Sequence, residues 1–255
     1  MLGAKLGISS KQYNIVTDGL VFDVEPGFQK SCDGTSIWNL SSGSNQVLSN
    51  YTGSFVTDAS FVGTSGNDAG YFALDGTDGY LYFGDTNQLN LFSGNVPCTL
   101  EAWFRTDPDH AGEDKRYAIF SRFSNSDPWA GFALAVGANT NGTKLEIWQA
   151  GGHWVYGSDD VQTGLWVHGM VTYTGTQSSG LKFYKNGSLS STETAYGTPS
   201  MGTSNDRFQI GCQYYSSAIQ RLMDGRIGSC RIYNRALSPG EVLQNYNASK
   251  DRYSN

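Results

Sequence analysis

Residues 221–249 read RLMDGRIGSCRIYNRALSPGEVLQNYNAS, in which a strand pattern runs directly into the start of a helix. Ser238 has a side chain that is preferred at an N-cap, and Pro239 follows it at the first helical position. Glu241 comes three residues after Ser238, which is the spacing of a capping box. The stretch therefore predicts a strand over 226–234 and a short helix that begins after Ser238.

The expected helix has one apolar side. Leu237 and Val242 occupy the two positions of a hydrophobic staple. Val242, Leu243 and Tyr246 share one face at helical spacing. We therefore expect this face to pack against the rest of the protein.

The composition favours many short strands in one large domain. The chain has 255 residues, of which 38% are hydrophobic and 16% charged, with 32 glycines, 15 tyrosines and 13 phenylalanines. Aromatic residues favour strands, and glycines favour the turns between them. Residues 18–255 are assigned to a single domain. Residues 1–17 form a polar arm that either lies along a partner or folds back on its own domain.

Charge and hydropathy exclude two classes of partner. The net charge is −6, and the 17 lysines and arginines are scattered rather than gathered in a stripe. No nucleic acid partner is therefore expected. No apolar run approaches about 18 residues, so no membrane span is expected. The first residues lack the apolar segment of a signal peptide, which predicts synthesis in a reducing cytoplasm.

The four cysteines have neither C-x-x-C spacing nor a nearby histidine, which argues against a zinc site. Our first interpretation is that they are small buried hydrophobes with free thiols. A Cys98–Cys230 or a Cys212–Cys230 disulfide is the alternative. The four are Cys32, Cys98, Cys212 and Cys230.

Strand patterns and turn signals alternate along the domain. In 98–105, apolar and polar residues alternate as in a strand with one buried face. Asn141-Gly142 and Asn186-Gly187 are two-residue hairpin signals. About a dozen strands in one sheet would leave bare edges, so two packed sheets are expected. The other expected strands are 19–24, 37–40, 71–74, 80–83, 117–123, 131–137, 144–149, 154–156, 166–174, 181–185, 208–212 and 226–234, with a short strand or two in the loop 41–70.

Several of these pieces resemble a known family. Residues 99–104 (TLEAWF) are similar to its F-T-I-E-A-W-V strand, and 166–173 (WVHGMVTY) to its W-x-H-V-A-L-T-Y strand. Residues 181–187 (LKFYKNG) and 231–238 (RIYNRALS) are similar to its last hairpin and its ending. In this order, over 71–249, they resemble the laminin-G-like, concanavalin A-like jelly rolls. The resemblance implies an all-β, antiparallel two-sheet sandwich with one short C-terminal helix.

The front of the domain narrows the resemblance. Residues 15–22 (IVTDGLVF) and 38–43 (WNLSSG) resemble an opening found in structural proteins of tailed bacteriophages, including marine and cyanobacterial ones. The residues at 24–27 and Asn39 depart from that pattern. The resemblance implies a virion structural protein, in first place a capsid decoration or cement protein. Its partners would be the major capsid protein, other virion proteins and sibling subunits in a homo-oligomer.

Two alternative functions stay open. One is a tail-fibre or receptor-binding lectin module that holds host glycans, and the other is a glycoside hydrolase. Hydrolases of this fold use paired carboxylates on one strand. Trp148 and Gln149 stand where those carboxylates belong after Glu146, and the chain has no G-x-S-x-G motif. The sequence therefore predicts binding rather than enzymatic activity.

Polar and aromatic residues alternate with the apolar positions of three strands. If these strands were neighbours in the concave sheet, their outward side chains would form a surface that stacks on sugars and bonds to hydroxyls. The other interpretation is a satisfied polar network, in which His168 is a structural histidine. The candidate residues are Glu101, Trp103, Arg105, Glu146, Trp148 and His168.

Two further groups of candidates concern calcium and partners. Asp75, Asp78, Asp206 and Asp224 are candidate ligands of a structural Ca²⁺, which the resemblance implies at loops with Asp and backbone carbonyls. Turn formation is the alternative role of the DGTDG segment. Exposed loop aromatics and the arm would contact partners. These partner-contact candidates are Lys5, Lys11, Tyr13, Trp129, Trp154, Tyr214 and Tyr215.

Overall fold

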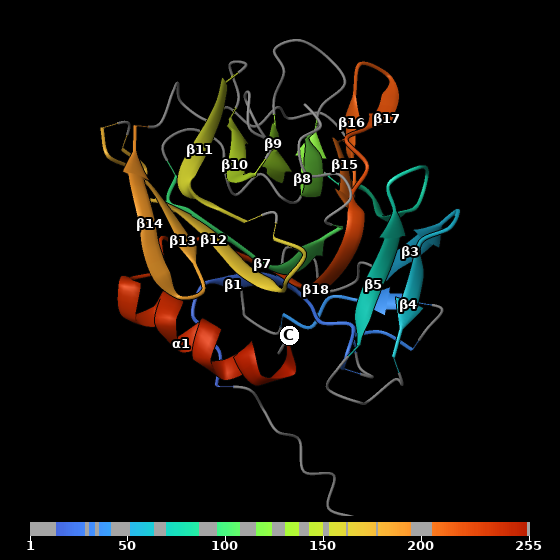
Figure 1. Ribbon diagram of the computed structural model, residues 1–255, viewed down its shortest axis with the longest axis horizontal. Helices are drawn as coiled ribbons and strands as arrows, with labels where there is room; N and C mark the ends of the chain where they lie inside the picture. The colour runs from blue at the N-terminus through green and yellow to red at the C-terminus, as the bar shows by residue number, and fades with distance from the viewer. Residues whose placement is uncertain are drawn as a thin grey trace, which may run out of the picture.

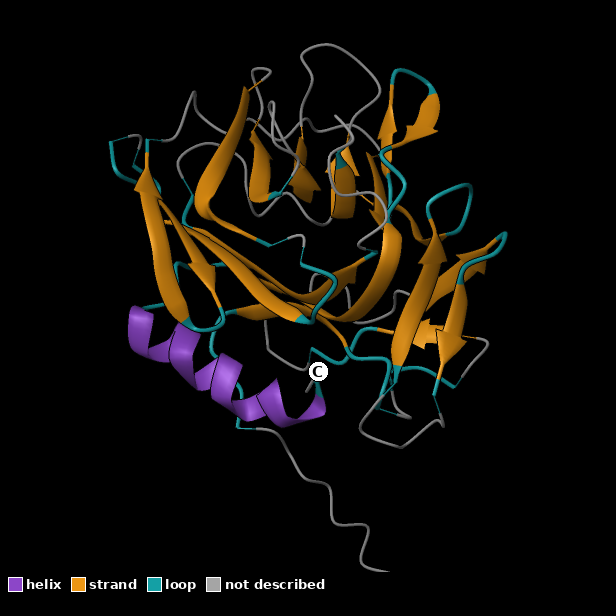
Figure 2. Cartoon of the chain, in the orientation of Figure 1, coloured by secondary structure: helices purple, strands orange, loops and turns teal. Residues whose placement is uncertain are grey.

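The protein is a sandwich of two antiparallel sheets, with one helix packed on the outside of one sheet (Figures 1 and 2). The expected all-β architecture with a short C-terminal helix is confirmed. Eighteen strands lie within the described residues. The computed structural model describes residues 14–28, 31–33, 36–41, 52–63, 70–86, 96–107, 116–123, 131–137, 143–149, 153–161, 163–176, 178–194 and 206–253.

The sheet under the helix, sheet A, contains the strands that carry the opening and closing motifs. Its order is β14-β13-β12-β7-β18-β5-β4, and β1 also pairs with β18. β12, β13 and β14 follow one another in the chain, but β1, β7 and β18 come from distant parts of it, so the centre of the sheet forms only when these parts meet. The bounds are β1 Leu20–Val24, β4 Ser60–Val62, β5 Tyr71–Asp75, β7 Cys98–Thr106, β12 Val167–Tyr173, β13 Leu181–Lys185, β14 Ser188–Glu193 and β18 Asp224–Tyr233.

The opposite sheet, sheet B, has the order β11-β10-β9-β8-β15-β6-β3-β2. A separate hairpin of β16 (Gln213–Tyr215) and β17 (Ala218–Gln220) follows β15 and contacts β8. The bounds are β2 Ser36–Trp38, β3 Thr52–Val56, β6 Tyr80–Thr86, β8 Tyr117–Phe123, β9 Gly131–Gly137, β10 Lys144–Gln149, β11 His153–Asp160 and β15 Asp206–Ile210.

The main core fills the space between the two sheets. Leu100 and Phe104 of sheet A are buried in one cluster with Leu145 and Ile147 of sheet B. Phe22 meets Phe208 edge to face, with ring centroids 4.8 Å apart. All four cysteines are buried and none forms a disulfide, so the prediction of buried thiols is confirmed and neither alternative pairing is present.

Helix α1 (Pro239–Ser249) begins as expected. The Ser238 side chain accepts a hydrogen bond from the Glu241 backbone N–H, and the Glu241 carboxylate accepts one from the Ser238 backbone N–H. A 3-10 turn, Lys250–Arg252, continues the helix. None of the helices in the described residues is long and apolar enough to cross a membrane.

The buried face of α1 differs from the expected one. Leu243 is 47% exposed, whereas Val242, Asn245 and Ser249 are buried. The helix docks on a polar part of sheet A, where Asn245 and Ser249 form hydrogen bonds to buried groups. Val242 is buried and Tyr246 stacks on Trp103 as expected, so apolar spacing was wrong for Leu243 and missed the two buried polar residues.

The last residues of the arm lie along this helix. The Val16 backbone N–H donates to Asn245 Oδ1 at 2.8 Å, and Gln244 Nε2 donates to the Asn14 carbonyl at 2.9 Å. Residues 14–17 therefore follow the second interpretation, in which the arm folds back on its own domain. Lys5, Lys11, Tyr13 and Trp129 lie outside the described residues.

The hairpin signal at Asn186-Gly187 is confirmed. Both residues have positive φ, 51° and 77°, and they join β13 to β14. A side chain at Gly187 would approach Tyr246 and Leu243 of the helix to about 3 Å. The other signal, 141–142, lies outside the described residues.

Candidate functional site

The six glycan-binding candidates lie on two opposite outer faces. Glu101, Trp103, Arg105 and His168 belong to β7 and β12 of sheet A, and Glu146 and Trp148 belong to β10 of sheet B. Their neighbours in sequence face the common core, so the two groups point away from each other. The expectation of one shared concave surface is wrong, because sheet membership depends on strand order rather than on alternation.

The sheet A group is a closed polar network beneath α1. Glu101 is fully buried and accepts hydrogen bonds from Arg231 Nη1 (2.8 Å), Asn245 Nδ2 (2.6 Å) and His168 Nε2 (3.1 Å). Arg231 also binds Asp23 at 3.0 Å and Glu25 at 2.7 Å. These groups face each other, as in the second interpretation, and both carboxylate oxygens of Glu101 are bonded, whereas Nδ1 of His168 has no hydrogen-bond partner within the described residues.

The network lowers the pKa of Glu101. Burial would raise the pKa of Glu101, but the Arg231 charge and the bond from His168 outweigh burial and lower the pKa to about 2. For Asp23 the balance is reversed, and burial raises the pKa against the pull of Arg231. The low pKa shows that Glu101 is charged and stabilising in the folded protein.

We expect the Glu101→Gln variant to lose stability in a pH-dependent way. Because the folded pKa lies below the ordinary 4.5, the stabilisation from ionised Glu101 is fully present above that value and disappears as pH falls toward 2. At neutral pH the variant should be less stable by on the order of 3 kcal/mol. Urea unfolding across pH 2 to 7 measures this gap, and a gap that stays constant with pH would contradict the assignment.

Trp103 joins the same face of sheet A to the end of α1. It is 2% exposed, and its Nε1 donates to Ser249 Oγ at 2.8 Å. Its ring stacks on Tyr253 at 4.8 Å and on Tyr246 at 5.9 Å. Arg105, further along the strand, is partly buried and lies opposite Arg226 of β18. Trp103 therefore holds the end of the helix against sheet A and is not an exposed surface on which a sugar could stack.

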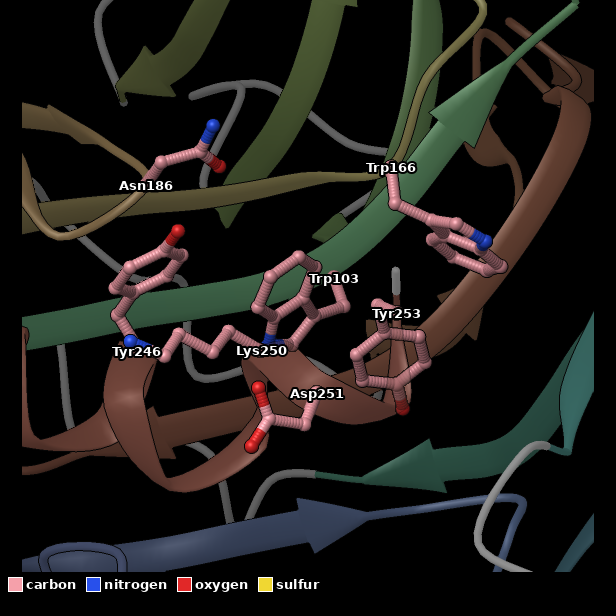
Figure 3. A pocket seen from close by; sticks show the side chains of 7 residues that line it. All are labelled: Trp103, Trp166, Asn186, Tyr246, Lys250, Asp251 and Tyr253. Carbon is pink, nitrogen blue, oxygen red and sulfur yellow. The ribbon is translucent and has the colours of Figure 1, made fainter. Parts of the chain in front are cut away.

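A pocket of about 260 Å³ opens beside this joint (Figure 3). Trp166 and Tyr253 form part of its wall, with their ring centroids 4.9 Å apart. Lys250 and Asp251 are exposed at its margin. These two rings pack on one another, so the pocket forms where the end of the helix contacts sheet A. It is lined by Trp103, Trp166, Asn186, Tyr246, Lys250, Asp251 and Tyr253.

The outer face of sheet B carries a different set of groups, which we call the outer cluster. Trp148, 8% exposed, meets Trp154 of β11 at 5.2 Å between ring centroids. Arg116, just before β8, forms an ion pair with Glu146 at 2.7 Å and lies 4.8 Å from the Trp154 ring. The outer cluster consists of Arg116, Glu146, Trp148, Trp154, Gln209, Gln213, Tyr215 and Arg221.

The β16–β17 hairpin supplies the other side of the outer cluster. Tyr215, like Trp154, packs against the cluster of Ala133 and Trp148. Arg221 follows the hairpin, donates to Gln213 Oε1 at 2.6 Å, and lies 5.2 Å from the Tyr215 ring and 5.4 Å from the Trp154 ring. Tyr214 lies outside this group, beneath the Arg207 guanidinium at 4.0 Å.

Several buried polar atoms of the outer cluster have no hydrogen-bond partner within the described part of the chain. They are Glu146 Oε1, both amide atoms of Gln209 and Nε2 of Gln213. Burial raises the pKa of Glu146, and the Arg116 guanidinium opposes this shift. Buried polar atoms are nearly always paired in folded proteins, so water or a polar ligand would complete the bonding of these atoms.

The sequence located only part of this cluster. Glu146 and Trp148 were expected to contact glycans, and Trp154 and Tyr215 to contact a partner. Arg116 and Arg221 were not expected, because both stand outside strands and no spacing rule connects them. The one local signal that could have suggested them is their position beside a strand, since Arg116 directly precedes β8 and Arg221 directly follows β17.

The aspartates form a small acidic group at the edge of sheet A. Carboxylate oxygens of Asp58, Asp75 and Asp78 lie within 4.8 Å of one another. Asp75 Oδ1 accepts hydrogen bonds from the backbone N–H groups of Thr77, Asp78 and Gly79, which is the turn-forming role of the segment. Asp224 lies opposite Asp75 in the ladder without joining this group, and the Asp206 side chain lies outside the described residues. Calcium here stays a prediction.

The comparisons with known proteins agree with this architecture. Residues 75–243 match the family model of the concanavalin A-like lectin/glucanases superfamily, in its laminin G form. Because the match covers more than half of the chain, the protein belongs to this superfamily. A comparison with curated protein sequences gives no significant match.

Solved structures share the fold at low identity. Domain 4 of AbnA, an arabinanase of Geobacillus stearothermophilus, is 16% identical with a TM-score of 0.59, over 90% of this chain and 98% of that one. The binding domain of Paraclostridial Mosquitocidal Protein 1 is 17% identical with a TM-score of 0.63, over 91% and 52%. A mutant Trypanosoma rangeli sialidase is 15% identical with a TM-score of 0.61, over 94% and 34%. The likeness concerns the fold.

Proposed function

We propose that this protein is a carbohydrate-binding module whose site is the outer cluster of sheet B. The observation that carries the proposal is a set of buried polar atoms in Glu146, Gln209 and Gln213 that have no partner in the described part of the chain, beside the rings of Trp154 and Tyr215. A sugar presents hydroxyls that both donate and accept, together with apolar ring faces. The outer cluster offers both kinds of contact.

The edge of sheet B extends the surface available to a ligand. Tyr156 lies opposite Glu146 in the β10–β11 ladder and is 51% exposed. It shares the outer face with Trp154, two residues before it. Aromatic side chains along an outer edge strand suit an extended oligosaccharide, because successive sugar rings can stack on successive residues.

Two relatives of the same fold support a binding role. The structure of domain 4 of AbnA is a complex with arabinotriose. Cell entry of botulinum neurotoxin type C depends on interaction with two ganglioside molecules. Proteins of different origin that contain this fold thus interact with glycans, which supports a binding role, although the present chain has its own side chains at the site.

Binding without cleavage is the form of activity that we propose. Glu146 is the single carboxylate of the outer cluster and is held by Arg116. A glycoside hydrolase of the usual kind needs an acid and a second carboxylate on either side of the scissile bond. The similarity to the sialidase extends over 34% of the sialidase chain and concerns the fold.

Replacement of Trp154 by alanine should weaken glycan binding by about tenfold or more, since buried aromatic contacts dominate recognition energies. A glycan array would first identify a ligand, and calorimetry would compare the variants. Trp166→Ala is the matched control, because Trp166 is also half-buried but lies by sheet A. Equal losses in the two variants would contradict the site, and release of reducing ends from the bound glycan would contradict a purely binding role.

The place of this module in a virion rests on the opening motif alone and stays a prediction. In that setting the module would be displayed on the particle surface as a capsid decoration protein or as part of a tail fibre, with sheet B facing outward. Mass spectrometry of purified phage particles tests the prediction, and absence of the protein from particles of a phage that encodes it would contradict it.

A further inference from the structure

Arg221 is a strained and incompletely neutralised cation in the outer cluster. Its φ is 53°, a left-handed conformation that is unfavourable for a residue other than glycine. Burial and the nearby Arg116 charge lower the pKa of Arg221. Strain of this kind persists where the surrounding structure enforces it, and such residues gather at functional sites.

The surroundings of Arg221 in the described part of the chain contain no carboxylate partner. Its hydrogen bond goes to the neutral amide of Gln213, and its other contacts are the rings of Trp154 and Tyr215. The nearby carboxylate of Glu146 is already paired with Arg116. The outer cluster thus holds two guanidinium groups and one carboxylate.

Two other arginines, Arg231 and Arg235, show the opposite arrangement. Arg231 is held by three carboxylates, and Arg235 forms ion pairs with Glu241 and Asp18. The net charge of the whole chain is −6, so a local excess of positive charge on sheet B runs against the average. A guanidinium in a half-buried place gains most from an anion that approaches it, because water screens the pair weakly there.

We propose that the glycan recognised by the outer cluster is anionic, with a carboxylate or sulfate group placed against Arg221. This inference rests on the proposed function and names its ligand class. The anion would accept two parallel N–H bonds from the guanidinium, and the sugar ring beside it would pack toward Trp154. Binding would also relieve the repulsion between Arg221 and Arg116.

The test is a glycan panel in which sialylated, uronate-containing and sulfated members stand beside neutral counterparts of the same backbone. At low salt the wild-type protein should bind the charged member of a pair at least about tenfold more tightly, and added salt should reduce this preference. Separate carboxylated and sulfated arms show which anion is used.

Variants locate the effect. Arg221→Gln should remove the preference while leaving weak binding to the neutral counterpart, and Arg221→Lys should keep part of it. Arg226→Gln is the matched control, because Arg226 is also half-buried and lies 4.9 Å from the Tyr71 ring, but on the sheet A side. Thermal unfolding confirms that each variant is folded.

The outcomes separate the two proposals. Equal affinity for charged and neutral members, or a preference that survives in Arg221→Gln, overturns the anionic ligand and leaves the carbohydrate-binding function standing. A folded wild-type protein that binds no member of the panel overturns both. A preference that disappears in Arg226→Gln instead places the anion site on sheet A and overturns the role of Arg221.

Discussion

Replacement of Arg231 by leucine should destabilise the protein by about 3–5 kcal/mol, since breaking a buried ion pair leaves its partner charges uncompensated. Arg231 is fully buried and binds Asp23, Glu25 and Glu101 through three different nitrogens. Leucine fills part of the volume but pairs with none of these carboxylates. They would then have to take up protons or draw water beneath the helix.

Urea unfolding of three variants beside the wild-type protein measures this effect. Arg235→Leu is the surface control, because the Arg235 side chain is 28% exposed and its ion pairs should contribute about 1 kcal/mol or less. Arg231→Leu combined with Asp23→Asn and Glu101→Gln should recover part of the lost stability, because it removes two of the stranded charges. Equal losses from Arg231→Leu and Arg235→Leu would show that the buried network contributes little.

This network shows where prediction from sequence stops. The strand over 98–105, the Ser238 capping box and the Asn186-Gly187 turn depend on neighbours within a few residues, and all three are present in the structure, although the strand is buried on both faces rather than on one. Glu101 and Arg231 are separated by 130 positions, and their pairing follows from β7 lying beside β18. No local pattern determines that arrangement.

The face of the helix gives the same lesson at shorter range. Apolar spacing favoured Leu243 as a buried residue, but Asn245 is buried instead because it bonds to Glu101, to the Tyr233 hydroxyl and to the backbone of Val16. A polar docking surface reverses the usual relation between hydropathy and burial. The sequence could predict that the helix docks, whereas the side that docks depends on what lies beneath it.

The candidate site divides in a similar way. Alternation correctly predicted that Glu146 and Trp148 point away from the core, because this depends on β10 alone. The residues that surround these two side chains were not predictable. Arg116 and Arg221 lie about 30 and 75 positions from Glu146 in the chain and approach it only through the order of sheet B. When a site is built from several strands, the sequence therefore predicts single residues of the site but not which residues come together.

Trp103→Ala should cost about 3–5 kcal/mol of stability, the range found when a buried aromatic side chain is removed. The variant loses the stacking on Tyr253 and Tyr246 as well as the bond to Ser249, so the end of α1 loses its main contact with sheet A. Amide hydrogen exchange should then accelerate over residues 245–253 more than in β9 or β10 of sheet B.

Trp103→Phe separates the two contributions of the side chain. It keeps a ring for stacking but lacks the indole N–H that donates to Ser249, so a loss of about 1–2 kcal/mol is expected. If Trp103 only holds the helix and the ligand binds sheet B, both variants should bind glycans as the wild type does under conditions in which they are folded. A folded Trp103→Ala protein that no longer binds glycan would move the site to the pocket beside α1, because Trp103 lines that pocket and has no part in the outer cluster.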